Sequence, residues 1–405
     1  MLTRRYADFA AAEDAVQEAL LVAATRWPRD GVPERPRGWL IQTAERRLLD
    51  AWRSDMSRRR REEVAARHDV GADVQDADDT LTLLFLCCHP ALTPASSIAL
   101  TLRAVGGLTT AEVARAFLVP EPTMAQRISR AKQRIATSDE PFRMPTEDEL
   151  PTRLASVLHV LYLVFNEGYA ASAGQHLHRA DLADEAIRMA RLVHAAFPAH
   201  AEASGLLALM LLTDARRPAR TDASGELVPL ADQDRRRWDR AKVAEGTRLV
   251  DAVLADPADR PRDAGPVGEY VLQAAIAAVH DQAATAGDTD WRHILALYEL
   301  LEQLTASPVV RINRAVAAAM VDGPAAGLAM LEEVDKALPS YHRTLTVRAH
   351  LLEMAGDQVA AREGYTEAAA RATSLPERRY LAGRAAALRN APPDADGSAT
   401  PPGQR

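Results

Sequence analysis

The chain has 405 residues, a net charge of −7 and an aromatic content of 5 %. Its length predicts several structural units, and its abundant Leu, Ala and Val without alternating strand patterns predict an all-α protein. It has no run of about 18 uncharged apolar residues and no signal segment, so we expect a cytoplasmic protein with no membrane span. A globally acidic chain does not coat nucleic acid, and any DNA contact must be confined to local basic patches.

Residues 9–27 predict an amphipathic helix with an acidic outer face. The helical period turns Val16, Leu20, Ala23 and Trp27 inward. The residues gathered outside are Asp14, Gln17, Glu18 and Leu21. An acidic face with one exposed apolar residue, beside a basic DNA-reading helix, suggests a surface for docking another protein. A plain solvated face would have the same pattern.

Residues 36–61 predict a second, basic amphipathic helix. Its buried stripe would consist of Leu40, Ile41, Ala44, Leu48 and Trp52. The other side gathers Trp39, Gln42, Thr43, Arg46, Asp50 and Arg53, followed by the run Arg58, Arg59, Arg60 and Arg61. An exposed Trp among arginines suits base stacking and phosphate neutralisation on an opened strand. The alternative is that Trp39 is a core residue at the start of the helix.

The charge pattern separates two basic segments by an acidic one. Residues 1–61 hold 13 Lys and Arg against 9 acids, and residues 101–135 hold 6 against 2. Residues 62–79 hold one Arg against seven acids, a composition that cannot bury a core and therefore predicts a flexible tether. The only cysteines, Cys87 and Cys88, stand in the apolar segment LLFLCCHPAL, which favours a buried core segment over a metal site.

Residues 108–135 predict a helix-turn-helix. Thr109 and Glu112 have the spacing of a capping box that opens the first helix, and Pro122 suits the first turn of the second. On the second helix the inward residues would be Met124, Ile128, Ala131 and Ile135.

The opposite side of this second helix carries a basic edge. Its members are Thr123, Gln126, Arg127, Arg130 and Arg134. Arg and Gln can make bidentate contacts to guanine and adenine edges, and Lys132 at the flank suits a phosphate. The alternative is an amphipathic helix pair with a solvated basic face.

Residues 146–390 predict a stack of helix pairs. Gly323 and Gly356 occupy equivalent places in two similar segments. The residues that follow these glycines fit the tetratricopeptide repeat, which has a period of about 34 residues. They are Ala325, Ala326, Ala360, Ala361, Tyr365, Ala368 and Pro376. Because one helix pair cannot bury its own apolar face, the pairs should stack into a solenoid, with a plain α-helical bundle as the alternative. Residues 213–242 interrupt the array as a loop with a short hairpin.

Three of these segments, in this order, resemble the sigma subunits of bacterial RNA polymerase of the small extracytoplasmic-function type. They are AEDAVQEA (12–19), RGWLIQTAERRLLDAWR (37–53) and GLTTAEVARAFLVPEPTMAQRISRAKQRI (107–135). In that family they correspond to the helix that binds core polymerase, the helix that melts and reads the −10 promoter element, and the helix-turn-helix that reads the −35 element. FNEGY (165–169) and SPVVRINRAVA (307–317), among others, resemble the C-terminal helical-repeat extension of one group of these sigma factors.

The resemblance implies a role for each exposed face. Core polymerase would be bound by Asp14, Gln17, Glu18 and Leu21. The −10 strand would be contacted by Trp39, Gln42, Thr43, Arg46, Asp50 and Arg53. The −35 duplex would be contacted by Thr123, Gln126, Arg127, Arg130, Lys132 and Arg134. The extension would replace a separate anti-sigma factor as the regulatory part, with a protein partner as one of its expected ligands.

The resemblance also implies the domain organisation. Residues 1–61 would form sigma region 2, short at its N-terminus because only Met1 to Asp8 precede the acidic helix. An acidic linker (62–79), region 4 (80–140), the helical-repeat extension (146–390) and a disordered tail (391–405) would follow.

Two other classes of function stay open at this point. One is a helix-turn-helix transcription regulator whose repeat domain senses an effector or a partner, and which binds DNA without polymerase. The other is an enzyme, which is disfavoured because the sequence has no Gly-rich phosphate loop, Ser-His-Asp set or HExxH motif. We therefore expect no catalytic residues, no metal site and no cofactor.

Overall fold

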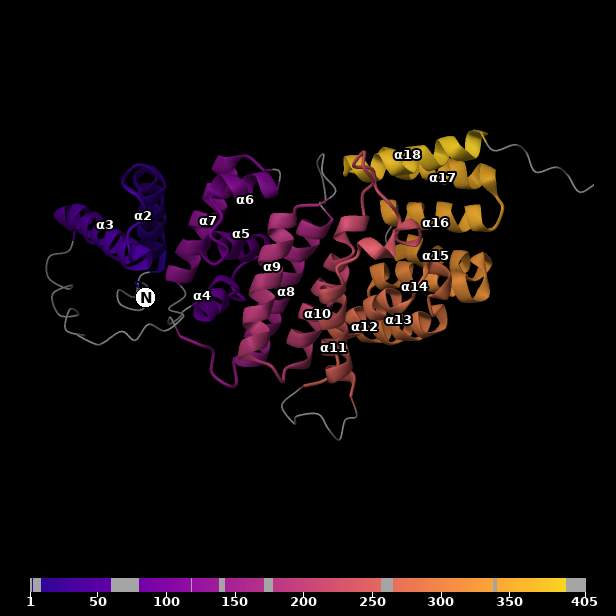
Figure 1. Ribbon diagram of the computed structural model, residues 1–405, viewed down its shortest axis with the longest axis horizontal. Helices are drawn as coiled ribbons and strands as arrows, with labels where there is room; N and C mark the ends of the chain where they lie inside the picture. The colour runs from indigo at the N-terminus through magenta and orange to yellow at the C-terminus, as the bar shows by residue number, and fades with distance from the viewer. Residues whose placement is uncertain are drawn as a thin grey trace, which may run out of the picture. The chain divides into compact units, whose positions relative to one another are not determined.

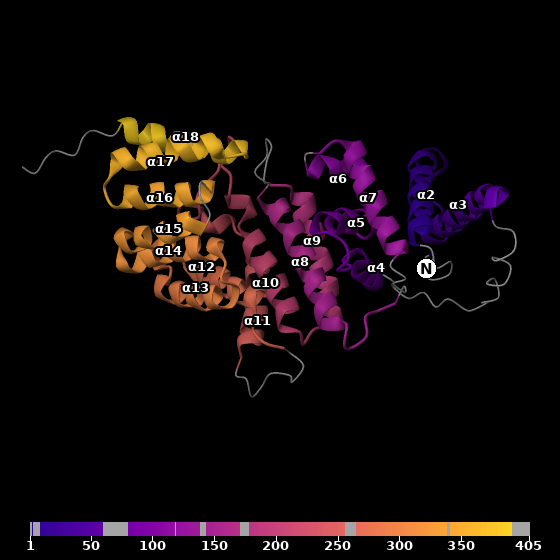
Figure 2. The ribbon, with the colours of Figure 1, turned by 180° about the vertical axis from the view of Figure 1, so that it is seen from behind.

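The computed structural model describes Leu2 and residues 9–59, 80–117, 119–137, 143–170, 178–255, 265–337 and 341–390. In this part of the chain the structure is helical, with one isolated β-bridge and no strand, so the all-α prediction is confirmed (Figures 1 and 2). The chain forms two compact units, residues 1–164 and residues 165–405. None of the described helices is long and apolar enough to cross a membrane. The predicted tether (62–79) and tail (391–405) lie outside the described residues.

The first unit begins with a pair of packed helices, α2 (Phe9–Asp30) and α3 (Pro36–Arg59). Their shared core is built from small side chains on α2 and two residues of α3, namely Ala12, Ala15, Ala19, Ala44 and Leu48. The prediction that Val16 and Leu20 point inward is wrong, because they are 38 % and 39 % exposed. Alanines repeating at helical spacing let the two backbones approach closely, which leaves the larger apolar side chains beside the contact.

The second part of this unit contains α4 (Thr80–Cys87), α5 (Pro94–Ala104), α6 (Thr110–Ala116) and α7 (Glu121–Ala136). Cys87 and Cys88 are buried, which confirms the prediction of a core segment, and burial raises the pKa of Cys88 to about 12. The helix α8 (Leu150–Tyr169) begins in this unit, where the buried Arg153 donates from Nη2 to the carbonyl oxygen of Phe85 at 2.8 Å.

The second unit is centred on α10 (Ala201–Ala215), which packs with α9 (Ala180–Ala196), α11 (Arg240–Leu254) and α12 (Glu269–Gln282). Nearly every residue of α10 is buried, as its continuous apolar sequence requires. Two glycines allow α10 to approach its neighbours closely. A Cβ on Gly205 would lie 2.7 Å from the backbone nitrogen of Val271, and one on Gly246 would lie 2.6 Å from Cγ of Leu212.

The predicted interruption after α10 is confirmed as a loop with a minimal hairpin. Three short 3-10 turns, η2 (Arg217–Ala219), η3 (Leu230–Asp232) and η4 (Arg235–Arg237), flank a single antiparallel bridge between Thr221 and Leu227. The loop is held by buried ionic contacts: Arg216 donates from Nε to Oδ1 of Asp281 at 2.6 Å. Its backbone therefore has a fixed position on the helices despite its polar composition.

The remaining helices stack in chain order (Figures 1 and 2). They are α13 (Trp291–Thr305), α14 (Pro308–Asp322), α15 (Pro324–Ala337), α16 (His342–Met354), α17 (Gln358–Arg371) and α18 (Leu375–Asn390). One period of about 34 residues separates the start of α14 from that of α16, and the start of α15 from that of α17, which confirms the predicted cadence. Gly323 (φ 92°) and Gly356 (φ 86°) follow α14 and α16 with positive φ, where a side chain would be strained.

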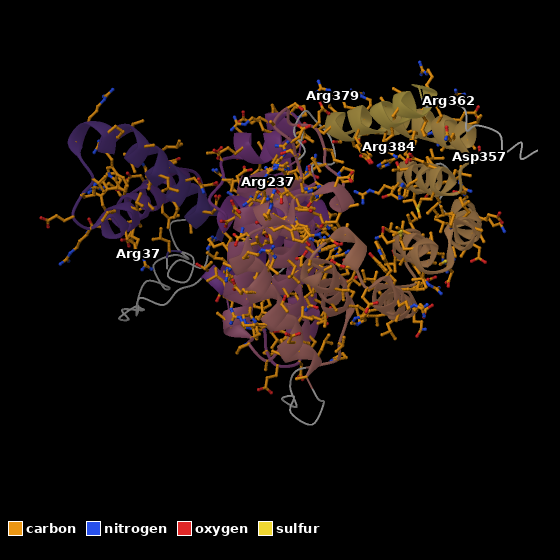
Figure 3. The ribbon with its side chains drawn as sticks, turned by 45° about the vertical axis from the view of Figure 1, so that its right-hand side comes forward. Arg37, Arg237, Asp357, Arg362, Arg379 and Arg384 are labelled. Atoms are coloured by element: carbon orange, nitrogen blue, oxygen red, sulfur yellow. The ribbon has the colours of Figure 1, made fainter. Side chains whose placement is uncertain are left out.

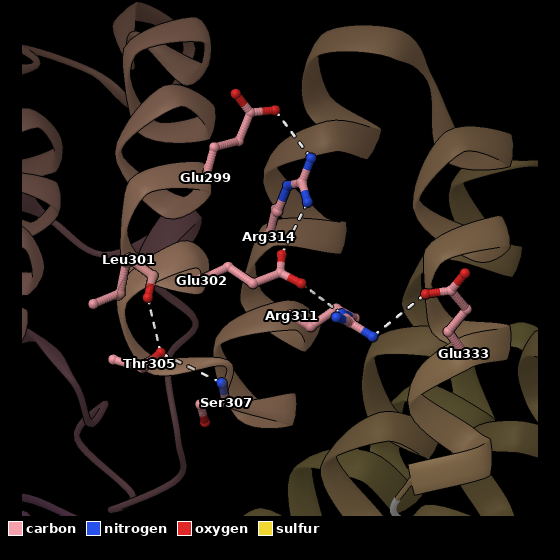
Figure 4. A network of polar contacts seen from close by, with 8 residues as sticks. All are labelled: Glu299, Leu301, Glu302, Thr305, Ser307, Arg311, Arg314 and Glu333. Carbon is pink, nitrogen blue, oxygen red and sulfur yellow. Dashed lines mark hydrogen bonds and ion pairs between the residues drawn. The ribbon is translucent and has the colours of Figure 1, made fainter.

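An ionic network links three of these helices (Figure 4). Glu302 on α13 accepts from Nε of Arg311 at 2.6 Å and from Nη1 of Arg314 at 2.9 Å, both on α14. Arg314 also donates to Glu299 at 3.0 Å, and Arg311 reaches Glu333 on α15 at 3.3 Å. α13, α14 and α15 are thereby joined by charge, and from α13 to α18 each helix also contacts the next one along the chain, as stacked helix pairs do.

Candidate nucleic-acid interface

The helix-turn-helix is built as its sequence predicts. The N–H of Thr109 donates to the Glu112 carboxylate at 2.7 Å, and the N–H of Glu112 donates to Oγ1 of Thr109 at 3.2 Å, which completes the capping box. The backbone N–H and the hydroxyl of Thr109 both donate to the Glu112 carboxylate, and these two hydrogen bonds lower the pKa of Glu112. Pro122 occupies the first turn of α7, where its missing N–H has no helical partner to lose.

The two faces of α7 are also as predicted. The residues buried against α5 and α6 include Met124, Ile128, Ala131 and Ile135. The opposite side exposes Thr123, Gln126, Arg130 and Arg134, with Arg127 half-buried beside them. All five side chains can form hydrogen bonds, and they lie on one side of α7. Their contact with DNA bases stays a prediction.

Lys132 is the exception on this helix, and its predicted place at the solvent flank is wrong. Its side chain is buried, donates to Oδ1 of Asp14 at 2.6 Å and also bonds to Glu13. The physical reason is the buried carboxylate of Glu13 on α2, which needs cationic partners. Arg103 on α5 supplies the second, with Nε 3.4 Å from Oε1 of Glu13. In this structure Lys132 is therefore not available to a phosphate.

The outer face of α2 is more apolar than the sequence indicates. Leu21 is 65 % exposed, and Val16 and Leu20 join it at the surface. Of the polar residues predicted there, Asp14 and Glu18 are exposed and Gln17 is half-buried. Glu18 lies 3.7 Å from Nε of Arg47 on α3. α2 therefore exposes three apolar side chains together with two carboxylates, a composition suited to docking a protein.

The predicted strand-contacting face of α3 is partly formed. Gln42, Arg46 and Asp50 are exposed, while Thr43 is half-buried and its hydroxyl donates to the carbonyl oxygen of Trp39 at 2.8 Å. The prediction of a freely exposed Trp39 is wrong, because its ring packs edge-on against Trp27, with 5.6 Å between centroids. This contact leaves Trp39 half-buried rather than freely exposed.

The side chains of Trp52 and Arg53, and of Arg58 to Arg61, lie outside the described residues. Arg37, near the start of α3, is exposed and labelled in Figure 3. Among the described residues no group of three His, Cys, Asp or Glu side chains has the geometry to hold a metal ion.

Sequence reasoning missed the buried cluster of Glu13, Arg103 and Lys132. Its members come from three helices, and each alone is consistent with a solvated face. The only signal within the sequence is that Glu13 lies next to Ala12 on the close-packed alanine stripe, where a carboxylate must be paired if it is buried.

Comparison with known proteins places these helices in a family. Sigma-70 region 2 matches residues 1–59, and sigma-70 region 4 matches residues 82–135. A probable extracytoplasmic-function RNA polymerase sigma factor of Mycobacterium tuberculosis, SigI, is 33 % identical over 152 residues, which are 34 % of this chain and 52 % of that protein. The chain belongs to the sigma-70 family, in its extracytoplasmic-function type.

Two further matches extend beyond the sigma regions of this sigma-70 family member. Residues 153–254 match a family of unknown function, DUF6596. An uncharacterised protein of Rhizobium meliloti is 42 % identical over 394 residues, which cover 94 % of this chain and 90 % of that protein. No solved structure gives a significant match. The similarity to that protein therefore spans both the sigma regions and the helical extension of this chain.

Proposed function

We propose that the protein binds core RNA polymerase and directs promoter-specific initiation of transcription, with its C-terminal helices as a regulatory extension. The observation that carries the proposal is the joint presence of a helix-turn-helix with a polar, arginine-bearing outer edge and an α2 face with exposed Leu21. Polymerase would supply the chemistry, and this chain would supply recognition. Its residues need only bind and orient DNA, which is consistent with a role that makes and breaks no covalent bonds.

Recognition of the −35 element would use the outer edge of α7. Gln126 and Arg130 are exposed there and Arg127 is half-buried, so their heads can reach base edges without unfolding the helix. Recognition of the −10 strand would use Gln42, Arg46 and Asp50 on α3 together with the half-buried Trp39. Docking to polymerase would use the exposed side chains of Val16, Leu20 and Leu21 together with the exposed carboxylates of α2.

A pull-down with purified core polymerase tests the docking step. Leu21→Asp places a charge among the exposed apolar side chains of α2, and Val32→Asp is a matched control because Val32 has the same exposure of 65 %. We expect the Leu21 variant to lose most of its core binding and the Val32 variant to keep it. Operator binding by a chain that never binds core would support the alternative, a helix-turn-helix regulator whose extension senses an effector or a partner.

The regulatory role has its own experiment, promoter-specific run-off transcription with and without the extension. The truncation should end after residue 170 rather than before α8, because Arg153 on α8 is bonded to Phe85 in the first unit. We expect the shortened chain to initiate with altered output or lost regulation. Unchanged, fully regulated output from the shortened chain would reject this role.

A further inference from the structure

The second unit contains a cavity of 460 Å³ that the sigma regions do not use. It lies where the hairpin loop meets the start of α16 and the beginning of α18. Its lining combines cations, hydroxyls and apolar groups, among them Arg220, Leu227, Arg343, Ser374, Tyr380 and Leu381. This volume falls within the range of about 300–1,000 Å³ that is typical of small-molecule sites.

Arg220 provides a partly buried cation without a carboxylate partner. Its guanidinium donates to the backbone carbonyl oxygen of Tyr169. Cζ of Arg220 also lies over the aromatic ring of Tyr169, 3.7 Å from the ring centroid. Among the described residues no acid forms an ion pair with it, and burial lowers the pKa of Arg220. A guanidinium removed from water without a counter-ion is costly, and an anion in the cavity would offset that cost.

Ser374 supplies a second, independent observation. It lines the same cavity, is 5 % exposed, and its Oγ has no hydrogen-bond partner among the described residues. Buried hydroxyl groups normally form a hydrogen bond. A buried hydroxyl without one in a cavity wall therefore points to a ligand that would form this hydrogen bond. Arg343 in the first turn of α16 is exposed beside it and adds a cation at a helix N-terminus.

The lining holds two arginines, Arg220 and Arg343, and one carboxylate, Glu377, so its cations outnumber its acids. Glu377, in the lining, has Oε1 3.6 Å from Nε2 of His342. Glu226, on the hairpin next to Leu227, accepts a hydrogen bond of 3.1 Å from Arg379 on α18. Arg379 is labelled in Figure 3. The second contact joins the hairpin to α18 at the surface beside the cavity.

We propose that this cavity binds a small organic anion, with its carboxylate or phosphate near Arg220 and Ser374 and its apolar or aromatic body against Tyr380 and Leu381. The proposal goes beyond promoter recognition and assigns the extension a chemical signal. An apolar wall with a few convergent polar groups favours a compound of that mixed character over a bare inorganic ion.

Calorimetric titration of the full-length protein tests the proposal with three probes of similar shape. Phenyl phosphate and benzoate carry the two anionic groups, and benzamide is the neutral control. We expect at least one anion to bind at a single site with a dissociation constant below about 1 mM, and benzamide to bind about tenfold more weakly or not at all. The stronger of the two anions identifies the headgroup.

Variants locate the site. Arg220→Gln should weaken anion binding about tenfold or more, and Ser374→Ala and Arg343→Gln should each weaken it measurably. Arg236→Gln is the matched control, because Arg236 is exposed, pairs with Asp234 and does not line the cavity. If Arg220→Gln fails to fold by circular dichroism, the other two variants carry the test, since neither side chain has a hydrogen bond or ion pair within the described part of the chain. Absent anion binding, equal binding of benzamide, or unchanged affinity in the cavity variants would overturn the proposal.

Discussion

Lys132, on the helix predicted to read DNA, is buried against Glu13 and Asp14, on the helix predicted to dock polymerase. Arg103 approaches the same Glu13 carboxylate from α5. The first unit therefore connects its two sigma regions through a charge cluster removed from water, and Asp14 is engaged within the chain. A partner that needs the Asp14 carboxylate must compete with Lys132 for it.

Breaking this cluster should destabilise the first unit. Lys132→Met leaves the buried Glu13 with Arg103 as its one remaining cation, so we expect a loss of about 3 kcal/mol in the free energy of unfolding. Urea denaturation measures it, with the exposed Arg134→Met as control. The double variant Glu13→Gln with Lys132→Met should be less destabilised than the sum of the single variants. Strict additivity would contradict an energetic coupling between the two residues.

Arg127 is predicted to read a base in the −35 element. Its replacement by Ala should cost about 1–3 kcal/mol of binding and relax specificity at one position. Gel-shift titrations against promoter duplexes that differ at single base pairs would measure this. Equal weakening on every duplex would instead make Arg127 a phosphate contact, and unchanged binding would remove it from the interface.

Two glycine substitutions in the second unit should have opposite signs. Gly205→Ala would place a Cβ 2.7 Å from the backbone of Val271, so we expect a destabilisation of about 1–3 kcal/mol or more. Gly383→Ala in the exposed part of α18 meets no atom within 4 Å, so better helix propensity should stabilise the protein by about 0.5–1 kcal/mol. Thermal unfolding measures both. A shift of the same sign in the two variants would contradict this account of the packing.

Acid should destabilise the second unit through His280. Burial, together with Arg216 and Arg235, lowers the pKa of His280 from 6.5 to about 3. Below about pH 6.5 the unfolded chain binds a proton at this residue that the folded chain does not, so the free energy of unfolding falls as pH decreases toward 3.

Denaturant unfolding at about pH 7 and about pH 5 should therefore show a loss on the order of 2 kcal/mol from this group. His280→Gln should make the pH dependence shallower, although burial also lowers the pKa values of His194, His200 and His350. An identical slope in the variant and the parent protein would exclude His280 as a contributor.

The sequence was sufficient wherever a local rule decides the structure. The helical period placed Met124 and Ile128 in the core of the helix-turn-helix, and the Thr109–Glu112 spacing located the start of α6. The tetratricopeptide cadence likewise placed the helices around Gly323 and Gly356. These features depend on residues close together in the chain or on a pattern that repeats along it.

It was insufficient wherever the decisive partner lies far along the chain. Lys132 is bonded to a residue 119 positions away, and Val16 is exposed because α3 meets the alanines of α2 instead. Arg220 and Ser374 line one cavity although several helices separate them along the chain, so no spacing rule could pair them. The helical period assigned the site residues on α2, α3 and α7 to their faces and the resemblance gave their roles, so their contacts with polymerase and DNA stay predictions.

The pair α16–α17 repeats the pair α14–α15 after about 34 residues. This repeat has a consequence for the length that the extension can have. Duplicating or deleting one whole helix pair would return each flanking helix to a neighbour of the same kind, with the Gly323 or Gly356 turn intact. A change of length by one complete helical hairpin would therefore keep the order of the stack, although the ion pairs of α13 with Arg311 and Arg314 depend on α14 itself.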